Sequence, residues 1–504
     1  MSTDDSSPPT PRFRLAIVGG GIAGLSLAVT LGRYADPSSP IQIDMYEAGP
    51  EITTVGAGIS VWPRTWVIVR ELGLYDELAS EAVKSNDSSG GDQLKPAFFY
   101  RKSDWQREGY DFARVMIPNG STTMHRAEMV DVLVRHLPQS CSIHTSKRLL
   151  NYTEASEDPG TAYTLHFADG TSATADVIIG ADGIKSKTRA TMYDLAHKAE
   201  CANPESEATK REDCERCKHA TPKWTGIVTY RYLIPSDTLR EINPNHRALD
   251  TPALLSYSGK HKHIVTYPIS HGKFVNFVGF VTDPGAQGTT YPHKWVMDAT
   301  REELVSQYPG WEREVEEMLR CVDSPTVWAI HVLDSLPFSV RGRVALMGDA
   351  VHPMTPHLGS GGGQAIEDAY ILGRLLADPR TSRARVEDVF RIYQDIRLPF
   401  GLGVVLRSDK VGHLCEFDYP GLYDGAPVSA SSQEEEMELT KEKLGGLGRA
   451  IEDVWSWQVK ERVEDQWNEA KGRYEALFRE LTEQPSKSVL QKVTNYWSRE
   501  CSIM

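Results

Sequence analysis

The sequence predicts a mixed α/β protein in which a parallel-sheet domain is interrupted by an inserted β-sheet domain and followed by C-terminal helices. Three observations predict this fold. Residues 15–46 run from an apolar stretch through a glycine turn and a helical pattern to a second apolar stretch, as a βαβ unit does. Residues 227–281 contain three runs rich in β-branched and aromatic side chains, which indicates a sheet. From Ile451 onward, apolar residues recur at steps of three and four, which indicates one long amphipathic helix.

The composition is that of a folded globular protein. The chain has 504 residues, of which 40% are hydrophobic and 25% charged, and a chain of this length typically forms about three folding units. Its formal net charge of −14 repels phosphate backbones, so we expect no nucleic-acid partner. No apolar run approaches the roughly 20 residues that cross a bilayer.

The N-terminus and the cysteines predict a cytoplasmic location. Residues 1–14 are rich in Ser, Pro and Asp and lack the basic and apolar regions of a signal peptide, so we expect a disordered leader. Seven cysteines, an odd number scattered over a long chain, suit reduced thiols better than a disulfide framework.

The expected elements follow one another with Gly, Pro and Ser between them. We expect strands at 15–18, 41–46, 178–180, 227–233, 263–269, 274–281 and 344–347, and helices at 25–33, 125–137, 364–376 and 451–481. The corresponding domain division is a leader (1–13), a discontinuous nucleotide-binding domain (14–83, 110–190 and 325–400), a substrate domain (84–109 and 191–324) and a C-terminal helical region (401–504).

A glycine fingerprint lies where the first strand meets the first helix. Residues 19–24, Gly-Gly-Gly-Ile-Ala-Gly, satisfy G-x-G-x-x-G in the context that the Rossmann fingerprint requires. Gly19 permits the tight turn, Gly21 lets the backbone approach a pyrophosphate, and Gly24 lets helix and strand pack. Glu47 lies 23 residues beyond Gly24, near the offset at which an acid binds ribose hydroxyls. These residues do not distinguish NAD from FAD.

Two further loops decide between the two cofactors. Asp182-Gly183 follows an apolar strand, and Gly348-Asp349 precedes a glycine-rich run at 359–363. Together with the fingerprint, these loops resemble the conserved motifs of the FAD-dependent aromatic hydroxylases, the single-component flavoprotein monooxygenases. Residues 348–372 are similar to the salicylate hydroxylase-like branch almost residue for residue. Further matches, from about residue 15 to beyond residue 457, lie at 55–61, 124–129, 230–231 and 263–269.

The resemblance implies a Rossmann-like FAD-binding domain with an inserted substrate domain, and it implies roles for single residues. Asp349 would hydrogen-bond the ribityl chain of FAD, and Arg126 its phosphate or ribityl region. Asp182 and Gly183 would face both FAD and a passing NADH or NADPH. Gly359, Gly361, Gly362 and Gly363 would offer backbone N–H groups to the flavin edge that gains negative charge. The remaining expected cofactor-binding residues are Gly19, Gly21, Ala23, Gly24, Glu47 and Gly58.

On the substrate side, the resemblance implies four catalytic residues. Pro356 would lie beside the flavin ring where oxygen reacts. Tyr230, Arg231 and Tyr267 would meet an aromatic substrate, because an Arg can hold a phenolate or carboxylate and a Tyr can orient it. Packing of these side chains within the sheet is the alternative that the sequence leaves open. One departure from the family is Trp62-Pro63-Arg64, where Pro-Asn is common, which leaves the cavity wall there in doubt.

The resemblance implies an enzyme that hydroxylates a phenolic ring with NAD(P)H and O2 through a C4a-hydroperoxyflavin. An ortho carboxylate on the attacked carbon would leave as CO2, as in salicylate-type decarboxylative hydroxylation. One alternative is oxidative dearomatisation of a polyketide-derived phenol. A remote alternative is a non-catalytic Rab-escort-like binding protein with the same FAD-binding architecture.

Two weaker patterns remain. The order of Cys201, Cys214, Cys217 and His219 has zinc-site spacing, but the segment also has the composition of a charged surface loop, and we expect no metal. Residues 501–504, Cys-Ser-Ile-Met, fit a farnesylation signal without an upstream polybasic stretch. If Cys501 is farnesylated, we expect only weak membrane association.

Overall fold

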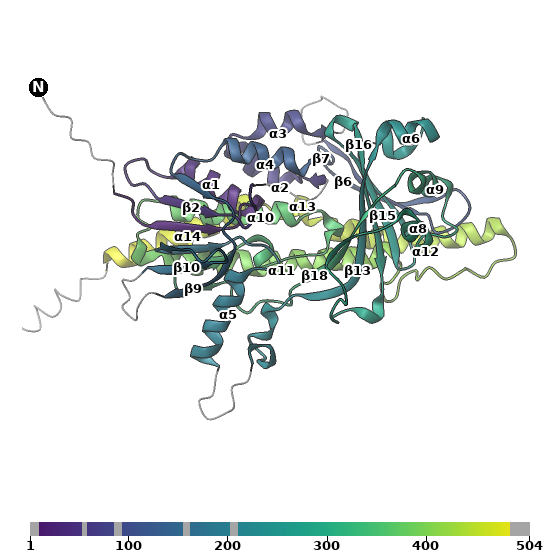
Figure 1. Cartoon of the computed structure of the whole chain (residues 1–504). Helices are drawn as coiled ribbons and strands as arrows, with labels where there is room; N and C mark the ends of the chain where they lie inside the picture. The colour runs from purple at the N-terminus through teal and green to yellow at the C-terminus, as the bar shows by residue number, and fades with distance from the viewer. Residues whose placement is uncertain are drawn as a thin grey trace, which may run out of the picture.

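Two large sheets, joined along one long helix, form the body of the molecule (Figure 1). The structure is a computed structural model, and it describes residues 10–52, 58–84, 93–154, 162–201, 210–251 and 253–483, with side chains as far as residue 480. The helix is α11 (Val386–Cys415), which contacts strands of both sheets. The cavity described below is lined by loops that follow strands of the first sheet and by strands of the second sheet.

The first sheet confirms the predicted parallel strands. Its order is β19-β20-β12-β1-β2-β8, and only β19 runs antiparallel to its neighbour. Val18 at the end of β1 is aligned with Gly180 on one side and with Tyr46 on the other, so the loops after these strands meet at one edge. The strands are β1 (Arg14–Val18), β2 (Gln42–Tyr46), β8 (Cys141–His144), β12 (Val177–Gly180), β19 (Val340–Arg341) and β20 (Val344–Leu346).

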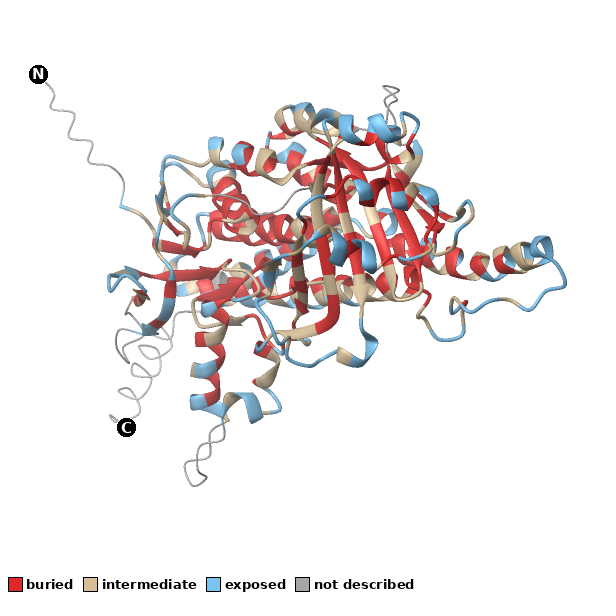
Figure 2. Ribbon diagram, turned by 45° about the vertical axis from the view of Figure 1, so that its right-hand side comes forward, coloured by how far each residue is buried: buried red, intermediate tan, exposed pale blue. Residues whose placement is uncertain are grey.

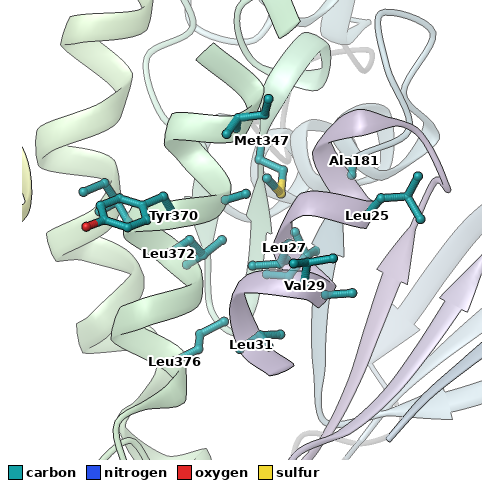
Figure 3. Packing of buried hydrophobic residues seen from close by; sticks show 14 of the residues in the cluster. Leu25, Leu27, Val29, Leu31, Ala181, Met347, Tyr370, Leu372 and Leu376 are labelled. Carbon is teal, nitrogen blue, oxygen red and sulfur yellow. The ribbon is translucent and has the colours of Figure 1, made fainter. Parts of the chain in front are cut away.

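Helices α1 (Ile22–Tyr34) and α10 (Gly361–Ala377) pack closely together over this sheet. Figure 3 shows Leu27 of α1 and Leu372 of α10 between the two helices, with Met347 close by, whereas the ring of Tyr370 points away from α1. All these side chains are buried, because each apolar helix stripe faces the core. The helices α2 (Pro63–Glu71), α3 (Tyr75–Glu81) and α4 (Arg126–Arg135) belong to the same region.

The second sheet has eight strands in the order β17-β18-β13-β16-β15-β14-β5-β6 and is antiparallel except at β14 and β5. It contains all three predicted β-rich runs. The strands are β5 (Leu94–Lys102), β6 (Tyr110–Pro118), β13 (Lys223–Pro235), β14 (Leu254–Gly259), β15 (Lys262–Ile269), β16 (Phe274–Thr282), β17 (Val296–Asp298) and β18 (Thr326–Val332). Because β5 pairs with β6, and β13 with β18, the expected domain borders at 109/110 and 324/325 divide this sheet.

Two three-stranded sheets and the shorter helices complete the described fold. The small sheets are β11-β10-β9 and β3-β7-β4, both antiparallel. Their strands are β3 (Gly58–Ser60), β4 (Val83–Lys84), β7 (Thr122–His125), β9 (Leu149–Glu154), β10 (Tyr163–Phe167) and β11 (Ser172–Ala175). The α-helices are α5 (Lys187–Glu200), α6 (Ser236–Ile242), α7 (Arg247–Asp250), α8 (Arg301–Ser306) and α9 (Arg313–Arg320). The 3-10 turns used below are η1 (Arg211–Asp213), η2 (Lys218–Ala220), η5 (Gly348–Ala350) and η6 (Pro356–Leu358).

The prediction of one unbroken helix from residue 451 is wrong. The structure has α12 (Gln433–Trp455), α13 (Trp457–Lys460) and α14 (Val463–Glu483) instead. Arg64 donates to the carbonyl oxygen of Glu461, and Arg407 donates to the Glu461 carboxylate at 2.6 Å. These tertiary contacts hold the chain in a turn at Glu461, which an apolar repeat does not reveal.

Burial follows both sheets and the inner faces of the helices that cover them (Figure 2). Exposed residues gather on the outer turns of the helices and on the connecting loops. Among the helices that the structure describes, none combines the length and the apolar character that crossing a membrane requires. Three segments lie wholly or mostly outside the described residues: residues 1–9, residues 84–93, which are mainly polar, and the Cys501–Met504 pattern.

Candidate active site

A cavity of about 350 Å³ lies between the edge of the parallel sheet and one face of the eight-stranded sheet. Loops after β1, β12 and β20 line it on one side, and β13, β15 and β16 line it on the other. Ligand sites in α/β proteins typically lie at the carboxyl ends of parallel strands. Most of the residues predicted from the sequence as site residues line this cavity: Gly21, Ala23, Gly58, Arg126, Gly183, Arg231, Tyr267, Asp349, Pro356, Gly359, Gly361 and Gly362.

The fingerprint glycines divide into one that faces the cavity and two that serve packing. A Cβ at Gly21 would meet nothing within 4 Å, so its backbone is open to a ligand. Gly19 has a φ of +109°, and a Cβ there would lie 2.4 Å from the Ala181 carbonyl oxygen. A Cβ at Gly24 would lie 2.1 Å from the carbonyl oxygen of Gly19. Gly19 and Gly24 therefore keep β1, α1 and the loop after β12 in close contact.

Glu47 lies beside the fingerprint, as the sequence predicts. Its carboxylate accepts the backbone N–H of Gly20 at 2.8 Å and that of Gly49 at 2.7 Å. Each oxygen of an ionised carboxylate accepts about two hydrogen bonds, so both retain capacity for hydroxyl groups of a ligand. Glu47 is half-buried, which leaves it within reach of one.

A buried carboxylate, that of Asp368, accepts a hydrogen bond from the turn that carries Asp349. Gly348 has a φ of +57°, a backbone region in which glycine is favoured. Its N–H donates to Asp368 Oδ2 on α10 at 2.9 Å. Asp349 itself is exposed to the cavity. The small side chain of Ala23 fits against this turn, since a Cβ on Gly348 would lie 3.1 Å from that of Ala23.

The glycine-rich run turns into α10 at the cavity. Gly359 is left-handed with a φ of +56°, and the helix begins at Gly361 after Ser360. The first N–H groups of a helix have no partner within it and carry the positive end of its dipole. Gly363 does not line the cavity, and a Cβ there would lie 2.7 Å from Thr65 Oγ1. Its lack of a side chain therefore serves the packing of α10 on α2.

The loop after β12 places Gly183, but not the Asp182 carboxylate, at the cavity. Asp182 Oδ2 accepts the N–H of Lys187 at 2.8 Å and of Thr188 at 3.0 Å, and the Ser186 hydroxyl donates to Oδ1. Asp182 thus satisfies the N-terminus of α5. The sequence identifies the Asp182-Gly183 motif. The Asp182 carboxylate, however, accepts hydrogen bonds from the start of α5 and does not line the cavity.

Arg126 is the first residue of α4, and a capping box formed by His125 and Glu128 fixes the start of this helix. The N–H of Ala127 donates to His125 Nδ1 at 3.1 Å, and the N–H of His125 donates to Glu128 at 2.9 Å. Arg126 lines the cavity, and its buried Nε has no hydrogen-bond partner among the described residues. An unpaired buried donor of a cation is costly unless a ligand accepts from it.

Strand alternation separates Arg231 from Tyr230. Arg231 lines the cavity, while Tyr230 packs with Tyr308 and Leu304 on the opposite face of the sheet. Successive side chains of a strand point to opposite faces, so adjacent residues could not both reach the cavity. The structure therefore does not bring Tyr230 to this site.

Arg231 and Tyr267 form the polar part of the substrate face. Arg231 donates to Thr229 Oγ1 at 3.3 Å and lies over the Trp328 ring at 4.9 Å, and it has no carboxylate partner within the described ranges. Burial and the nearby charge of Arg126 lower the pKa of Arg231, yet a guanidinium remains protonated at neutral pH. Burial raises the pKa of Tyr267 to about 12, so its hydroxyl is neutral and can donate a hydrogen bond.

Pro356 and His357 form the wall between the flavin-type loops and the substrate face. Pro356 begins η6 and lines the cavity. His357 also lines it, with its ring 5.0 Å from Phe280 and 5.1 Å from His263. Burial and the neighbouring imidazoles keep the pKa of His357 well below its ordinary value, so the ring is neutral.

The sequence analysis missed several residues of the site. Asn276 on β16 is buried and lines the cavity; a single amide in an otherwise apolar strand was the available signal. Trp62 donates its indole N–H to the carbonyl oxygens of Leu358 at 2.9 Å and Gly359 at 3.2 Å. The departure at Trp62-Pro63-Arg64 thus supports the glycine turn. The other missed lining residues are two serines, Ser60 on β3 and Ser360 before α10, and a set of apolar residues: Ile22, Ile59, Phe98, Ala181, Leu254, Val265, Val278, Phe280, Met354 and Ala365.

Glycine-rich loops after parallel strands thus face a sheet that carries the half-buried guanidinium of Arg231 and the buried phenol of Tyr267, an arrangement suited to a nucleotide-binding protein with a second, partly polar ligand site. Comparison with known proteins makes the class specific. The model of the family described as FAD binding domain matches residues 12–200 and 313–408. A salicylate hydroxylase of Pseudomonas putida is 34% identical over 426 residues, covering 83% of this chain and 88% of that protein.

Two further relatives agree with this class. The 6-methylsalicylate 1-monooxygenase atA of Aspergillus terreus is 33% identical over 396 residues, covering 77% of this chain and 79% of that protein. A solved structure described as a salicylate hydroxylase substrate complex aligns with a TM-score of 0.71 at 29% identity, covering 92% of this chain and 98% of that one. The chain belongs to the FAD-dependent aromatic monooxygenases, in the branch that contains salicylate hydroxylase.

Proposed function

We propose that this FAD-dependent monooxygenase hydroxylates a phenol that carries an ortho carboxylate and releases that carboxylate as CO2. The observation that carries the proposal is Arg231, a half-buried guanidinium that faces the cavity and has no carboxylate partner among the described residues. Arg is the side chain best suited to bind a carboxylate through two hydrogen bonds. The salicylate hydroxylase relatives act on such a substrate by name.

The residues of the nucleotide side fit FAD. The space beside the Gly21 backbone is open, because a Cβ there would meet no atom within 4 Å. The buried Nε of Arg126 has no hydrogen-bond partner in the described part of the chain. We assign the pyrophosphate to the α1 N-terminus, a ribose to Glu47, and the ribityl chain to Asp349 and Arg126. The N–H groups at Gly361 and Gly362 would meet the flavin edge. Reduced by NADH or NADPH, bound FAD activates O2 and supplies the oxygen atom to the ring.

The chain's own residues then hold and shield the substrate. Arg231 binds the carboxylate, and the neutral Tyr267 hydroxyl donates to the phenolic oxygen, so the ring lies in one orientation. Asn276 offers a further polar contact beside Tyr267, with which it is aligned across β15 and β16. Phe98, Val265 and Phe280 give apolar walls that exclude water from the reacting carbon. Pro356 shapes the side of the cavity that faces the glycine-rich turn.

The reaction balances with the partners named. Salicylate, NAD(P)H, O2 and two protons give the 1,2-diol, CO2, NAD(P)⁺ and water. The hydride of NAD(P)H would supply the two electrons by way of bound FAD; one oxygen atom enters the ring at the carbon that loses the carboxylate, and the other leaves as water. The carbon–carboxyl bond supplies the electron pair that restores aromaticity.

The test is NADH and NADPH oxidation by the FAD-loaded protein with salicylate and with its 4-hydroxy isomer as matched control. We expect salicylate to accelerate oxidation and to yield the diol, while the isomer, whose carboxylate and hydroxyl are not adjacent, does neither. A product that gains oxygen and retains every carbon would instead favour dearomatisation or ring hydroxylation without CO2 loss. Failure of every phenol to accelerate oxidation would contradict the proposal.

We also propose a cytoplasmic location, which the lack of disulfides among the six described cysteines supports: Cys141, Cys201, Cys214, Cys217, Cys321 and Cys415. We keep β6 and β18 with the substrate sheet in the proposed domain division, because they pair with its strands. Farnesylation of Cys501 stays a prediction from the sequence.

A further inference from the structure

Three cysteines and one histidine come together at the outer end of α5, away from the cavity. Figure 1 shows α5 projecting from the body of the molecule. His197 lies in its last turn and Cys201 caps it, so both side chains stand on one face of the helix. Cys214 and Cys217 lie between η1 and η2, which pack against α5.

The spacing of the four side chains is that of a tetrahedral metal site. One ligand atom from each of His197, Cys201, Cys214 and Cys217 lies within 4.8 Å of the others. The sulfur atoms of Cys201 and Cys217 are 3.9 Å apart. Two thiolates on one zinc ion, each about 2.3 Å from it in tetrahedral geometry, stand about 3.8 Å apart, whereas a disulfide requires about 2.05 Å.

The surroundings suit bound thiolates. The backbone N–H groups of Arg216 and Cys217 and the His197 side chain interact with the Cys214 sulfur. The Arg216 side chain interacts with the Cys201 sulfur. Three thiolates and one neutral imidazole around Zn²⁺ carry a net charge of −1, so donors and a guanidinium beside the sulfurs stabilise the occupied site.

The cluster also has the apolar support that the sequence does not reveal. Cys217 is completely buried, His197 is 7% exposed, and both lie against the core that contains Met192, Tyr193 and Ala196. The sequence pattern pointed to His219 as the fourth member. In the structure, His219 Nδ1 lies 3.5 Å from the Asp334 carboxylate instead, and His197 completes the group.

We infer that His197, Cys201, Cys214 and Cys217 bind one structural zinc ion. This inference departs from the expectation, drawn from the sequence, that the segment binds no metal. Four protein ligands leave no open position, so the site is structural and takes no part in the redox reaction. Soft thiolates with imidazole favour zinc over magnesium or calcium.

The ion would fix the segment before β13 to α5. Arg189 on α5 donates to the carbonyl oxygens of Ala220 at 2.9 Å and Ala350 at 3.0 Å. The first carbonyl ends the cysteine-bearing segment, and the second adjoins Asp349. Arg189 therefore links the segment that the metal would hold to the turn at the cavity.

The test is the zinc content of the full-length protein, made without a polyhistidine tag and purified without chelators. We expect about one zinc per chain by elemental analysis. Zinc content should fall at least about tenfold in Cys214→Ser/Cys217→Ser. Cys141→Ser, which removes a thiol on β8, and His219→Ala should retain the metal. His197→Ala should weaken binding, and His197→Cys should restore it, because four thiolates also hold zinc.

Replacement of zinc by Co²⁺ gives a second readout that does not depend on turnover. Tetrahedral Co²⁺ absorbs at longer wavelengths than the flavin, and these bands should appear in the wild-type protein and vanish in Cys214→Ser/Cys217→Ser. The inference is overturned if the reduced protein neither contains zinc nor takes up added zinc against a colorimetric chelator. It is equally overturned if His219→Ala loses the metal while His197→Ala keeps it, or if Cys201 and Cys217 are isolated as a disulfide.

Discussion

Asp368 on α10 accepts the backbone N–H of Gly348 at 2.9 Å, so a buried carboxylate holds the turn that presents Asp349 to the cavity. The same carboxylate lies 2.7 Å from His352 Nε2 and accepts from Arg397 Nε at 2.8 Å. Asp368, His352 and Arg397 are all essentially inaccessible to solvent. A charged group is retained in such a place only when several partners satisfy it.

We predict that Asp368→Asn destabilises the protein and weakens its hold on FAD. The substitution leaves His352 and Arg397 without their common counter-charge, and breaking a buried ion pair costs about 3–5 kcal/mol. Thermal unfolding and FAD release by dilution measure the two effects. Asp131→Asn, at an exposed position of α4, is the matched control and should change neither by more than about 0.5 kcal/mol.

The same carboxylate predicts a pH dependence with a definite sign. Burial opposes its ionisation, but the charges of His352 and Arg397 hold the pKa of Asp368 at about 2. A lowered folded-state pKa gives stability that is present above the unfolded value, about 4, and is lost as the pH falls toward 2. Unfolding midpoints between pH 5 and 2 should therefore fall more steeply for the wild type than for Asp368→Asn. Parallel curves would contradict this role.

For His352 the sign is reversed. Burial lowers the pKa of His352, but the Asp368 carboxylate raises this pKa more strongly, so it lies above its ordinary value. This contribution is complete below pH about 6.5 and is lost as the pH rises through the folded-state pKa. His352→Gln should thus remove a decline in stability on the alkaline side, which thermal unfolding above pH 6.5 measures. An unchanged alkaline decline would contradict the assignment.

Trp62→Phe should loosen the turn before α10 while keeping most of the buried ring. The change removes the indole donor to the carbonyl oxygens of Leu358 and Gly359, which are buried or half-buried. We expect a loss of about 1–3 kcal/mol and weaker FAD binding. Trp224→Phe removes a similar indole donor, to Ile227 O at 2.9 Å on β13, and should leave FAD affinity unchanged. Equal effects of both variants on FAD affinity would contradict a special role for Trp62.

Arg231→Gln and Tyr230→Phe test the two faces of β13. Loss of the guanidinium should lower kcat/KM for a carboxylated phenol by roughly 30-fold or more, as the loss of a buried charge pair of about 2–5 kcal/mol implies. Tyr230→Phe, one residue away on the opposite face, should have little effect. An Arg231→Gln variant with unchanged kcat/KM for salicylate would refute carboxylate binding at this position.

Gly58→Ala should disturb the substrate side through Tyr267. A Cβ at Gly58 would lie 2.5 Å from the Tyr267 hydroxyl oxygen, so this ring must move. Overpacking of this kind costs about 1–3 kcal/mol, and we expect a higher KM with FAD still bound. Gly472→Ala, on α14 where a Cβ meets nothing within 4 Å, is the control and should not alter KM. An unchanged KM in Gly58→Ala would show that Tyr267 does not touch the substrate.

The sequence predicted the parts of the fold that local pattern determines. The glycine turn at Gly19, the parallel strands and the helix after Gly359 follow from backbone needs that few residues meet. The face of Tyr230, the engagement of Asp182 and the histidine beside Cys214 could not be predicted. These features depend on contacts that form only in the folded chain. They are the side of β13 that faces the cavity, the hydrogen bonds at the start of α5, and the packing of α5 against η2, and a single sequence does not reveal them.

Hydroxylation at the ring carbon that bears the carboxylate distinguishes the proposed reaction from the alternatives. The direct measurement is the yield of labelled CO2 from carboxyl-¹³C salicylate per NAD(P)H oxidised by the FAD-loaded protein. We expect a ratio near one, less a fraction of uncoupled oxidation, with the 1,2-diol formed in equal amount. Oxidation of NAD(P)H and consumption of salicylate with the label retained in the aromatic product would contradict it.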